Sequence, residues 1–208
     1  MAVSQSQRLR RAAEKASRRK AIVAEKRKAE LAMAGTRQIV DAARAPVETC
    51  AVTEGLFETG MGTVVLARKL PSGLVGASFF LVDVWCLGIK NAFFSVMTSQ
   101  EFEDQMDMAD QGEYPMVDAD PSYVRKLLHD AAAYADQFGL TPHEDFAAVE
   151  RIFGDIPLGA ETFTFGKDGK PFFVAGPNDS LTRMRRILDI LGKRAGADGF
   201  DYMLGIDG

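Results

Sequence analysis

The sequence predicts an α+β protein, in which an antiparallel β-meander and a C-terminal β-hairpin pack against several helices, preceded by a basic N-terminal helical arm. Three observations lead to this prediction. Strand-like apolar segments separated by short turns occupy residues 46–97, helix start signals dominate residues 98–154, and basic residues crowd residues 1–30. We therefore expect a basic helical arm over residues 1–45 and a single globular domain over residues 46–208.

The expected arm is rich in Ala, Lys, Arg and Glu, which favour helix formation. It holds few large apolar side chains, so such a helix gains little from packing and should project from the domain. Residues 1–30 contain ten basic and three acidic residues, whereas the 208-residue chain has a net charge of −4. At about 100° per residue, six cations fall on one basic stripe: Arg8, Arg11, Lys15, Arg18, Arg19 and Lys26.

Three strands are expected in the meander. The first two cover residues 50–57 and 63–70, and a long third strand covers residues 75–87. The turns between them are short, which requires antiparallel pairing, because parallel strands need long crossover connections. The third strand is apolar on both faces, and this pattern is typical of a central strand that is covered on both sides.

Helices are expected over residues 98–154. Asp120 followed by proline marks a helix start, and Gly139 marks its end. Residues 141–144 have the pattern of a capping box for a second helix, which Gly154 closes. Ser99 is the candidate cap of a shorter helix through the acidic stretch that follows it.

A β-hairpin and a further helix are expected near the C-terminus. Asp168 and the glycine after it predict a turn between strands at residues 162–165 and 171–174. Asp179 or Ser180 should then cap a helix that runs to about Leu191.

The basic stripe suggests a polyanionic partner. Cations spaced along one side of a helix can follow a phosphate backbone, and binding of this kind weakens steeply with salt. No aromatic residue precedes Phe57, so the arm cannot stack on bases. The leading hypothesis is a non-enzymatic accessory protein that binds RNA or the ribosome through residues 8–28, with DNA less favoured. A solvated tail, a mitochondrial targeting peptide and contact with an anionic membrane surface stay open as alternatives.

Asp83 is a candidate catalytic residue because it interrupts an apolar strand. A buried carboxylate is costly unless it is hydrogen-bonded, paired or bound to a cation. It could be a metal ligand or general base, with Lys90 orienting a phosphate. The protein would then be a Mg²⁺-dependent nuclease or a related phosphoryl-transfer enzyme. Alternatively, Asp83 is structural and accepts hydrogen bonds from a nearby loop, so the sequence leaves open whether the protein is an enzyme.

Residues 101–120 contain eight carboxylates and no Lys or Arg. This segment could be a solvated surface, a set of Mg²⁺ ligands together with Asp83, or an internal mimic of nucleic acid that binds the arm. It could equally face a basic protein partner, which would make the chain a protein–protein interaction module. We expect no zinc site, because two cysteines and two histidines lack ligand spacing: Cys50, Cys86, His129 and His143. The leading hypothesis requires no cofactor.

A cytoplasmic location and no membrane span are expected. No apolar run reaches the roughly 18 residues that a membrane-spanning helix needs, and no signal-peptide core follows Met1. The segments FFLVDVWCLGIKNAFF and EGLFETGMGTVVLARKLPSG, with the basic opening, resemble a group of bacterial proteins to which no activity is attached. The resemblance implies a bacterial, cytoplasmic protein and nothing about mechanism.

Overall fold

The computed structural model describes residues 35–110, 114–177 and 179–204. The chain divides into two units, which comprise residues 1–38 and residues 39–208. The second unit starts before the boundary expected at residue 46, because Ile39, Ala42 and Ala45 are buried in it. Among the described helices, none is both long and apolar enough to cross a bilayer.

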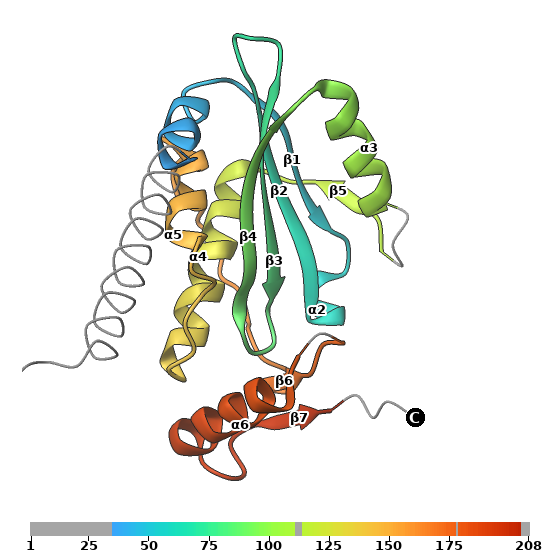
Figure 1. Cartoon of the computed structure of the whole chain (residues 1–208). Coiled ribbons are helices and arrows are strands. Elements are labelled where there is room, and N and C mark those ends of the chain that lie inside the picture. Colours follow the sequence, from blue (N-terminus) through green and yellow to red (C-terminus); the bar gives the residue numbers. More distant parts are fainter. Residues whose placement is uncertain (1–34, 111–113, 178, 205–208) are drawn as a thin grey trace, which may run out of the picture. The chain divides into compact units, whose positions relative to one another are not determined.

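A five-stranded antiparallel sheet is the centre of the second unit, and its strand order is β4-β3-β2-β1-β5 (Figure 1). The expected antiparallel meander is confirmed, because the first four strands are neighbours in chain order. The strands are β1 (Val47–Thr53), β2 (Met61–Lys69), β3 (Val75–Asp83), β4 (Gly88–Met97) and β5 (Met116–Asp118).

Two of the expected strand boundaries were wrong. The first strand ends at Thr53, because Gly55 and Gly60 adopt positive φ angles of 66° and 82° around a short helix, α2 (Leu56–Thr59). The expected third strand over residues 75–87 ends at Asp83 as β3, and its last four residues, 84–87, form the turn that leads into β4. The continuous apolar sequence concealed this turn, since its side chains are buried like those of the strands.

Helices cover both faces of the sheet (Figure 1). One face packs against α4 (Pro121–Gln137), α5 (Phe146–Val149) and the 3₁₀ helix η1 (Glu150–Phe153), and the other packs against α3 (Ser99–Asp110). The side chains of Phe80 and Phe79 in β3 point into these two different clusters. The third strand is therefore covered on both sides, as its apolar pattern predicted.

The expected start of α4 is confirmed, and that of α3 needs a small correction. The Asp120 carboxylate accepts hydrogen bonds from the backbone N–H groups of Ser122 and Tyr123 at 2.8 and 3.2 Å. Thr98, rather than Ser99, caps α3. Its hydroxyl accepts from the Glu101 N–H, and the Glu101 carboxylate accepts in return from the Thr98 N–H.

The capping box expected at residues 141–144 is wrong. The backbone N–H of His143 donates to the carbonyl of Ile89 at 2.9 Å, which holds this segment against β4. As a result, α5 begins only at Phe146. Gly154 does end the helical segment, with a φ of 54°.

The C-terminal strand pair exists, but it is parallel and not a hairpin. Strands β6 (Phe172–Val174) and β7 (Asp201–Met203) are joined by α6 (Leu181–Ala195). Residues 162–165 form no strand, because Phe163 and Phe165 pack on the rings of Phe57 and Tyr134 instead. The expected Asp-Gly turn is present only as a tight loop closed by a bridge between Lys167 and Lys170.

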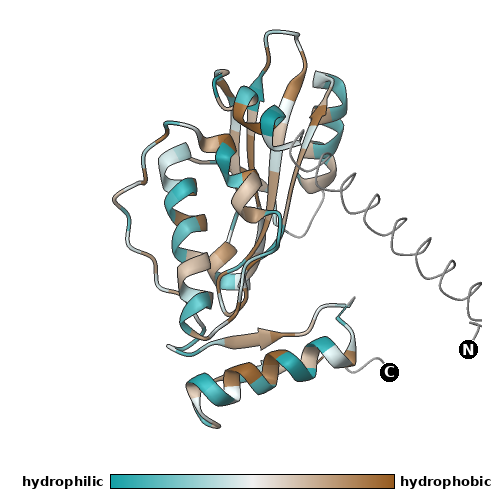
Figure 2. Ribbon diagram, turned by 60° about the vertical axis from the view of Figure 1, so that its left-hand side comes forward, coloured by the Kyte–Doolittle hydropathy of each residue, from teal (hydrophilic) through white to brown (hydrophobic). Residues whose placement is uncertain are grey.

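Helix α6 begins as the sequence indicated. The Ser180 hydroxyl accepts a hydrogen bond from the Arg183 N–H at 3.2 Å, and the helix continues past the expected end at Leu191 to Ala195. Figure 2 shows hydrophilic and hydrophobic residues alternating along it. Its apolar residues Ile187 and Leu191 pack with Cys86 and Leu87 of the β3–β4 turn.

Arg68 in β2 is a buried cation, with 6% of its surface exposed. Its guanidinium donates to the carbonyl oxygens of Ala45 at 2.7 Å, Ile152 at 2.9 and 3.2 Å, and Phe153 at 3.0 Å. Burial lowers the pKa of Arg68. The side chain therefore fastens β2 to η1 and to the segment before β1 through neutral acceptors.

Replacing Arg68 with Met should destabilise the fold by about 3 kcal/mol, because three buried carbonyl groups lose a charged donor. The measurement is urea unfolding followed by circular dichroism. Arg151→Met is the matched control, since Arg151 in η1 is exposed. An equal loss of stability in both variants would contradict the role assigned to Arg68.

Candidate functional site

Asp83 lies at the end of β3 and organises the turn that follows. Its Oδ1 atom accepts hydrogen bonds from the backbone N–H groups of Trp85 at 3.0 Å and Cys86 at 2.8 Å. The residue is only 4% exposed. These contacts correspond to the structural interpretation of Asp83, in which backbone groups of a loop satisfy the carboxylate.

The environment of Asp83 favours its neutral form. Burial raises its pKa from 3.8 to about 6, although backbone N–H groups and the charge of Lys90 act in the opposite direction. Burial also raises the pKa of the Cys86 thiol, with a further contribution from Asp83. Cys86 is thus a protonated, buried thiol at neutral pH and not an activated nucleophile.

Lys90 is close enough to Asp83 for its charge to act on the carboxylate, but it lines a cleft that Asp83 does not line. In the pairing of β3 with β4, Leu81 lies opposite Asn91 and Val82 lies opposite Ile89. Lys90 is therefore the extra residue of a β-bulge, a distortion that redirects a side chain. Within the described residues Lys90 forms no ion pair, and it lines a cleft.

The Mg²⁺ alternative receives no geometric support in the described part of the chain. Residues 101–110 lie on α3, which covers one face of the sheet, and Asp120 is used as the cap of α4. No three His, Cys, Asp or Glu side chains among the described residues converge on a common point. The hypothesis that Asp83 and the 101–120 carboxylates hold a metal ion is therefore supported by the sequence pattern alone.

The cysteines and histidines considered for zinc do not come together in the described structure. Burial raises the pKa of Cys50 to about 12, which is typical of an inert thiol. His129 is exposed on α4 and contacts Asp130 at 3.0 Å. The ring of His143 accepts a hydrogen bond from the Asp145 N–H at 3.3 Å.

The six cations of the expected basic stripe lie outside the described residues: Arg8, Arg11, Lys15, Arg18, Arg19 and Lys26. Their proposed role in binding a polyanion therefore stays a prediction from the sequence.

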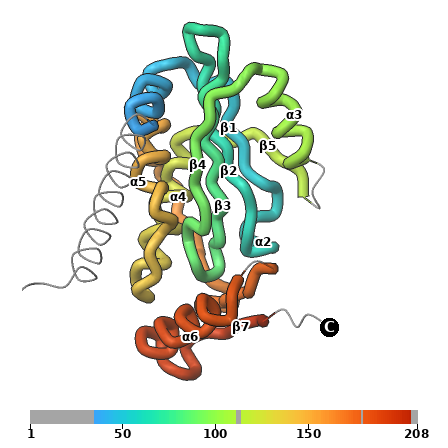
Figure 3. Tube along the Cα trace, viewed as in Figure 1, coloured from blue at the N-terminus to red at the C-terminus, as the bar shows by residue number. Residues whose placement is uncertain are grey.

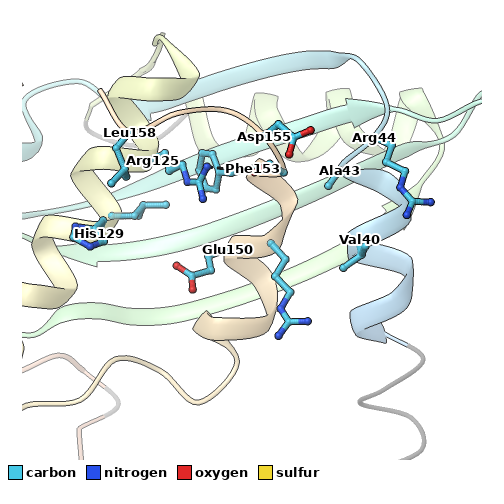
Figure 4. Close-up of a pocket in the computed structure, with 12 residues that line it drawn as sticks. Val40, Ala43, Arg44, Arg125, His129, Glu150, Phe153, Asp155 and Leu158 are labelled. Carbon is cyan, nitrogen blue, oxygen red and sulfur yellow. Dashed lines mark hydrogen bonds between the residues drawn. The ribbon is translucent and has the colours of Figure 1, made fainter. Parts of the chain in front are cut away.

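A cleft of about 600 Å³ lies between α4, η1 and residues 40–44 (Figure 4). It contains both signs of charge. Arg125 donates to the carbonyl oxygens of Gly154 and Ile156, and Arg44 pairs with Asp41 at 3.4 Å. Burial raises the pKa of Glu150, against the effect of nearby cations. Two of its three arginines thus have partners within the protein, and the third, Arg151, shares the cleft with the carboxylates of Glu150 and Asp155.

A second cleft, of about 310 Å³, lies between the start of β4, residues 139–143 and α6. Lys90, Arg183 and Arg186 line it, and no carboxylate does. Figure 3 shows how α6 runs beneath the turn that joins β3 to β4. Of the two clefts, this one has the unbalanced positive charge that an anionic ligand requires.

The cationic character of α6 was not singled out from the sequence. The helix has five basic residues and one acidic residue, Asp189: the basic residues are Arg183, Arg185, Arg186, Lys193 and Arg194. Only Arg183 forms an ion pair within the described residues, at 3.0 Å from Asp179. The net charge of all residues after residue 30 is negative and hides this local excess. The net charge calculated over segments of 15 residues, the length of α6, would have shown it.

Comparisons with protein-family models, with curated proteins and with solved structures give no match. The assignment of a function therefore depends on the residues and the geometry described above.

The buried Asp83 should make stability depend on pH in an unusual direction. Its pKa is raised in the folded state, so between about pH 4 and 6 the folded protein retains a proton that the unfolded chain releases. Stability should fall as pH rises through this window, by about 3 kcal/mol from this residue. Asp83→Asn keeps an acceptor for the turn and should remove this part of the pH dependence, as measured by urea unfolding at each pH.

Asp136→Asn, at an exposed position of α4, is the control for the loss of one carboxylate. If Asp83→Asn and Asp136→Asn change the pH profile equally, the raised pKa of Asp83 is not the cause.

Proposed function

We propose that the protein is a non-enzymatic accessory protein that binds RNA, free or within the ribosome, through its basic residues 8–28. The proposed site of action is the cytoplasm. The observation that carries the proposal is the uneven distribution of charge: residues 1–30 hold ten of the 25 basic residues but only three of the 29 acidic residues. A polyanion is the ligand that such a segment attracts most strongly.

The described unit supports the same class of partner. Five of the 14 basic residues in residues 39–208 lie on α6, and four of those five form no ion pair with a described residue. Cations that are left without protein carboxylates remain available to phosphate groups. Two separate basic segments in an otherwise acidic chain are easier to explain by a long anionic partner than by a small ligand.

The basic segment has no aromatic side chain, so it cannot stack on bases. Its charge is carried by Lys and Arg side chains spaced along one stripe. The expected contacts are therefore to the phosphate backbone, without sequence specificity. Structured RNA, including ribosomal RNA, offers many such phosphates in the cytoplasm.

Neutralising the basic stripe should remove most of the RNA affinity. The variant changes all six of its cations to Gln in the full-length chain: Arg8, Arg11, Lys15, Arg18, Arg19 and Lys26. The slope of log affinity against log salt should become shallower by about 4, since each phosphate contact with a single strand contributes roughly 0.7. The measurement is fluorescence anisotropy with a labelled single-stranded RNA over a series of salt concentrations.

A control variant replaces the four basic residues outside the stripe: Arg10, Lys20, Arg27 and Lys28. Per charge removed, this change should weaken binding less. Equal losses per charge would show that the net charge matters and the stripe does not. If the chain without residues 1–30 binds RNA as tightly as the full chain, the proposal is refuted, and salt-insensitive binding would refute it too.

The same binding reactions distinguish the enzymatic alternative. Adding Mg²⁺ should leave the length of the RNA unchanged on a denaturing gel. Cleavage that appears with Mg²⁺ and disappears in Asp83→Asn would support phosphoryl transfer instead. A pull-down with and without nuclease treatment tests the third alternative. A basic protein that stays bound to the chain after nuclease treatment would support a protein–protein interaction through the acidic residues 101–120.

A further inference from the structure

The second cleft, between the start of β4, residues 139–143 and α6, combines an apolar floor with a cationic rim. Leu87, Ile89, Leu140 and Ile187 contribute to the floor, and all four are at most 6% exposed. Lys90 rises from β4 on one side, and Arg183 and Arg186 extend from α6 on the other. An arrangement of this kind receives a ligand with one apolar flat part and one anionic part.

The bulge in β4 gives Lys90 its position. Because Ile89 and Asn91 occupy the paired positions opposite Val82 and Leu81, Lys90 is excluded from the regular alternation of the strand. On the other side, a Cβ placed at Gly176 would lie 3.8 Å from the Lys90 Nζ atom, so the ammonium group reaches the loop before α6. A strand residue is thus directed toward the loop before α6, where the Asp179 carboxylate also lies close to Gly176.

The charge of the rim is only partly neutralised. Arg183 pairs with Asp179, whose other carboxylate oxygen accepts a hydrogen bond from the Gly176 N–H at 2.8 Å. Lys90 and Arg186 have no ion pair within the described residues. Since no carboxylate lines the cleft, an anion that enters it meets Arg186 without an ion pair among the described residues. It also meets Lys90, whose charge acts on the buried Asp83.

The cleft also opens onto a cationic surface. A more open depression of about 570 Å³ on α6 shares Arg186 and Ile190 with it and is lined further by Arg185, Lys193 and one carboxylate, Asp189. An extended polyanion could therefore occupy the outer surface of α6 while one of its units enters the cleft. A volume of about 310 Å³ is at the lower end of the range for ligand pockets, roughly 300–1,000 Å³, and suits one nucleotide.

We propose that this cleft binds one nucleotide of an RNA strand, with the base on the apolar floor and its phosphate between Lys90 and Arg186. The inference rests on the proposed function and adds a specific contact to it. Since the floor is aliphatic, it accepts any base that fits, and the contact contributes affinity without sequence specificity. The α6 cations Arg185 and Lys193 lie outside the cleft lining and act on the strand only through their charge.

The test uses the full-length chain and a labelled single-stranded RNA decamer. Lys90→Gln combined with Arg186→Gln should weaken binding roughly tenfold, because two charged phosphate contacts are lost. The charge-matched control combines Arg185→Gln with Lys193→Gln and should weaken binding only about twofold. Unchanged thermal unfolding of both double variants shows that the fold is intact, as expected for side chains on the surface.

A third variant blocks the cleft without changing its charge. Thr141 lines the cleft and is exposed, so Thr141→Trp should fill the entrance and weaken RNA binding to a degree similar to the Lys90 and Arg186 variant. Cross-linking with RNA that contains 4-thiouridine should label peptides of residues 87–90 or 139–143 in the unmodified chain, and Thr141→Trp should prevent this labelling.

Each result decides one question. If the two double variants bind RNA equally well and no cross-link forms at the cleft, the cleft proposal is overturned, whereas the function of residues 8–28 is unaffected. If the unmodified chain binds no RNA at all, the proposed function fails. Uridine 5′-monophosphate is the second probe. If this free nucleotide slows hydrogen exchange of the cleft peptides while the decamer forms no cross-link there, the cleft binds a free nucleotide and not a unit of an RNA strand.

Discussion

The turn between β3 and β4 is the constraint on which the rest of the described unit depends. The Asp83 carboxylate closes this turn by accepting the N–H groups of Trp85 and Cys86. The turn then bonds outward in three directions: the Trp85 indole N–H donates to Phe57, and the carbonyls of Val84 and Trp85 accept from Gly166 and Phe172. Glycine is required on both sides, because a Cβ at Gly60 would lie 2.1 Å from the Trp85 ring and one at Gly88 would lie 2.7 Å from the Ala131 carbonyl. One four-residue turn thus joins the meander, α2, α4 and the segment that leads into β6.

This arrangement explains why the cleft is at this place. Cys86 and Leu87 of the turn are buried against Phe173 of β6 and against Ile187 and Leu191 of α6. The apolar contact fixes one side of α6 on the end of the sheet and leaves its basic side free. Because β4 starts immediately after the turn, the bulged Lys90 lies beside the helix that the turn holds. Burying Asp83 has a free-energy cost, which is visible in its raised pKa. The turn that Asp83 closes offsets this cost by holding β4 and α6, which are distant in the sequence, next to each other.

The sequence allowed the local signals to be predicted better than the pairings. The α4 cap at Asp120 and the meander were correct, because both depend on residues close together in the chain. The long strand over residues 75–87 was wrong because a turn closed by Asp83 has buried apolar side chains, as a strand does. The partner of β6 was missed for another reason: Phe163 and Phe165 have strand-like patterns but pack on Phe57 and Tyr134, and only tertiary contacts decide between these outcomes. For the site, Asp83 and Lys90 were identified as notable, but the bulge and the opposing α6 cations follow from register and packing.

The net charge of the chain is a poor guide to its partner, because charge acts locally. In physiological salt the interaction between exposed charges is screened over about 8 Å, so the carboxylates of α3 neutralise α6 only where they lie within that distance. No described carboxylate other than Asp179 forms an ion pair with an α6 cation. A polyanion near the described unit therefore meets a repulsive surface at α3 and an attractive one at α6, and the acidic excess restricts where it can bind. In the proposed complex with RNA, the carboxylates would contribute selectivity without touching the RNA, because they disfavour orientations in which α6 faces away from it.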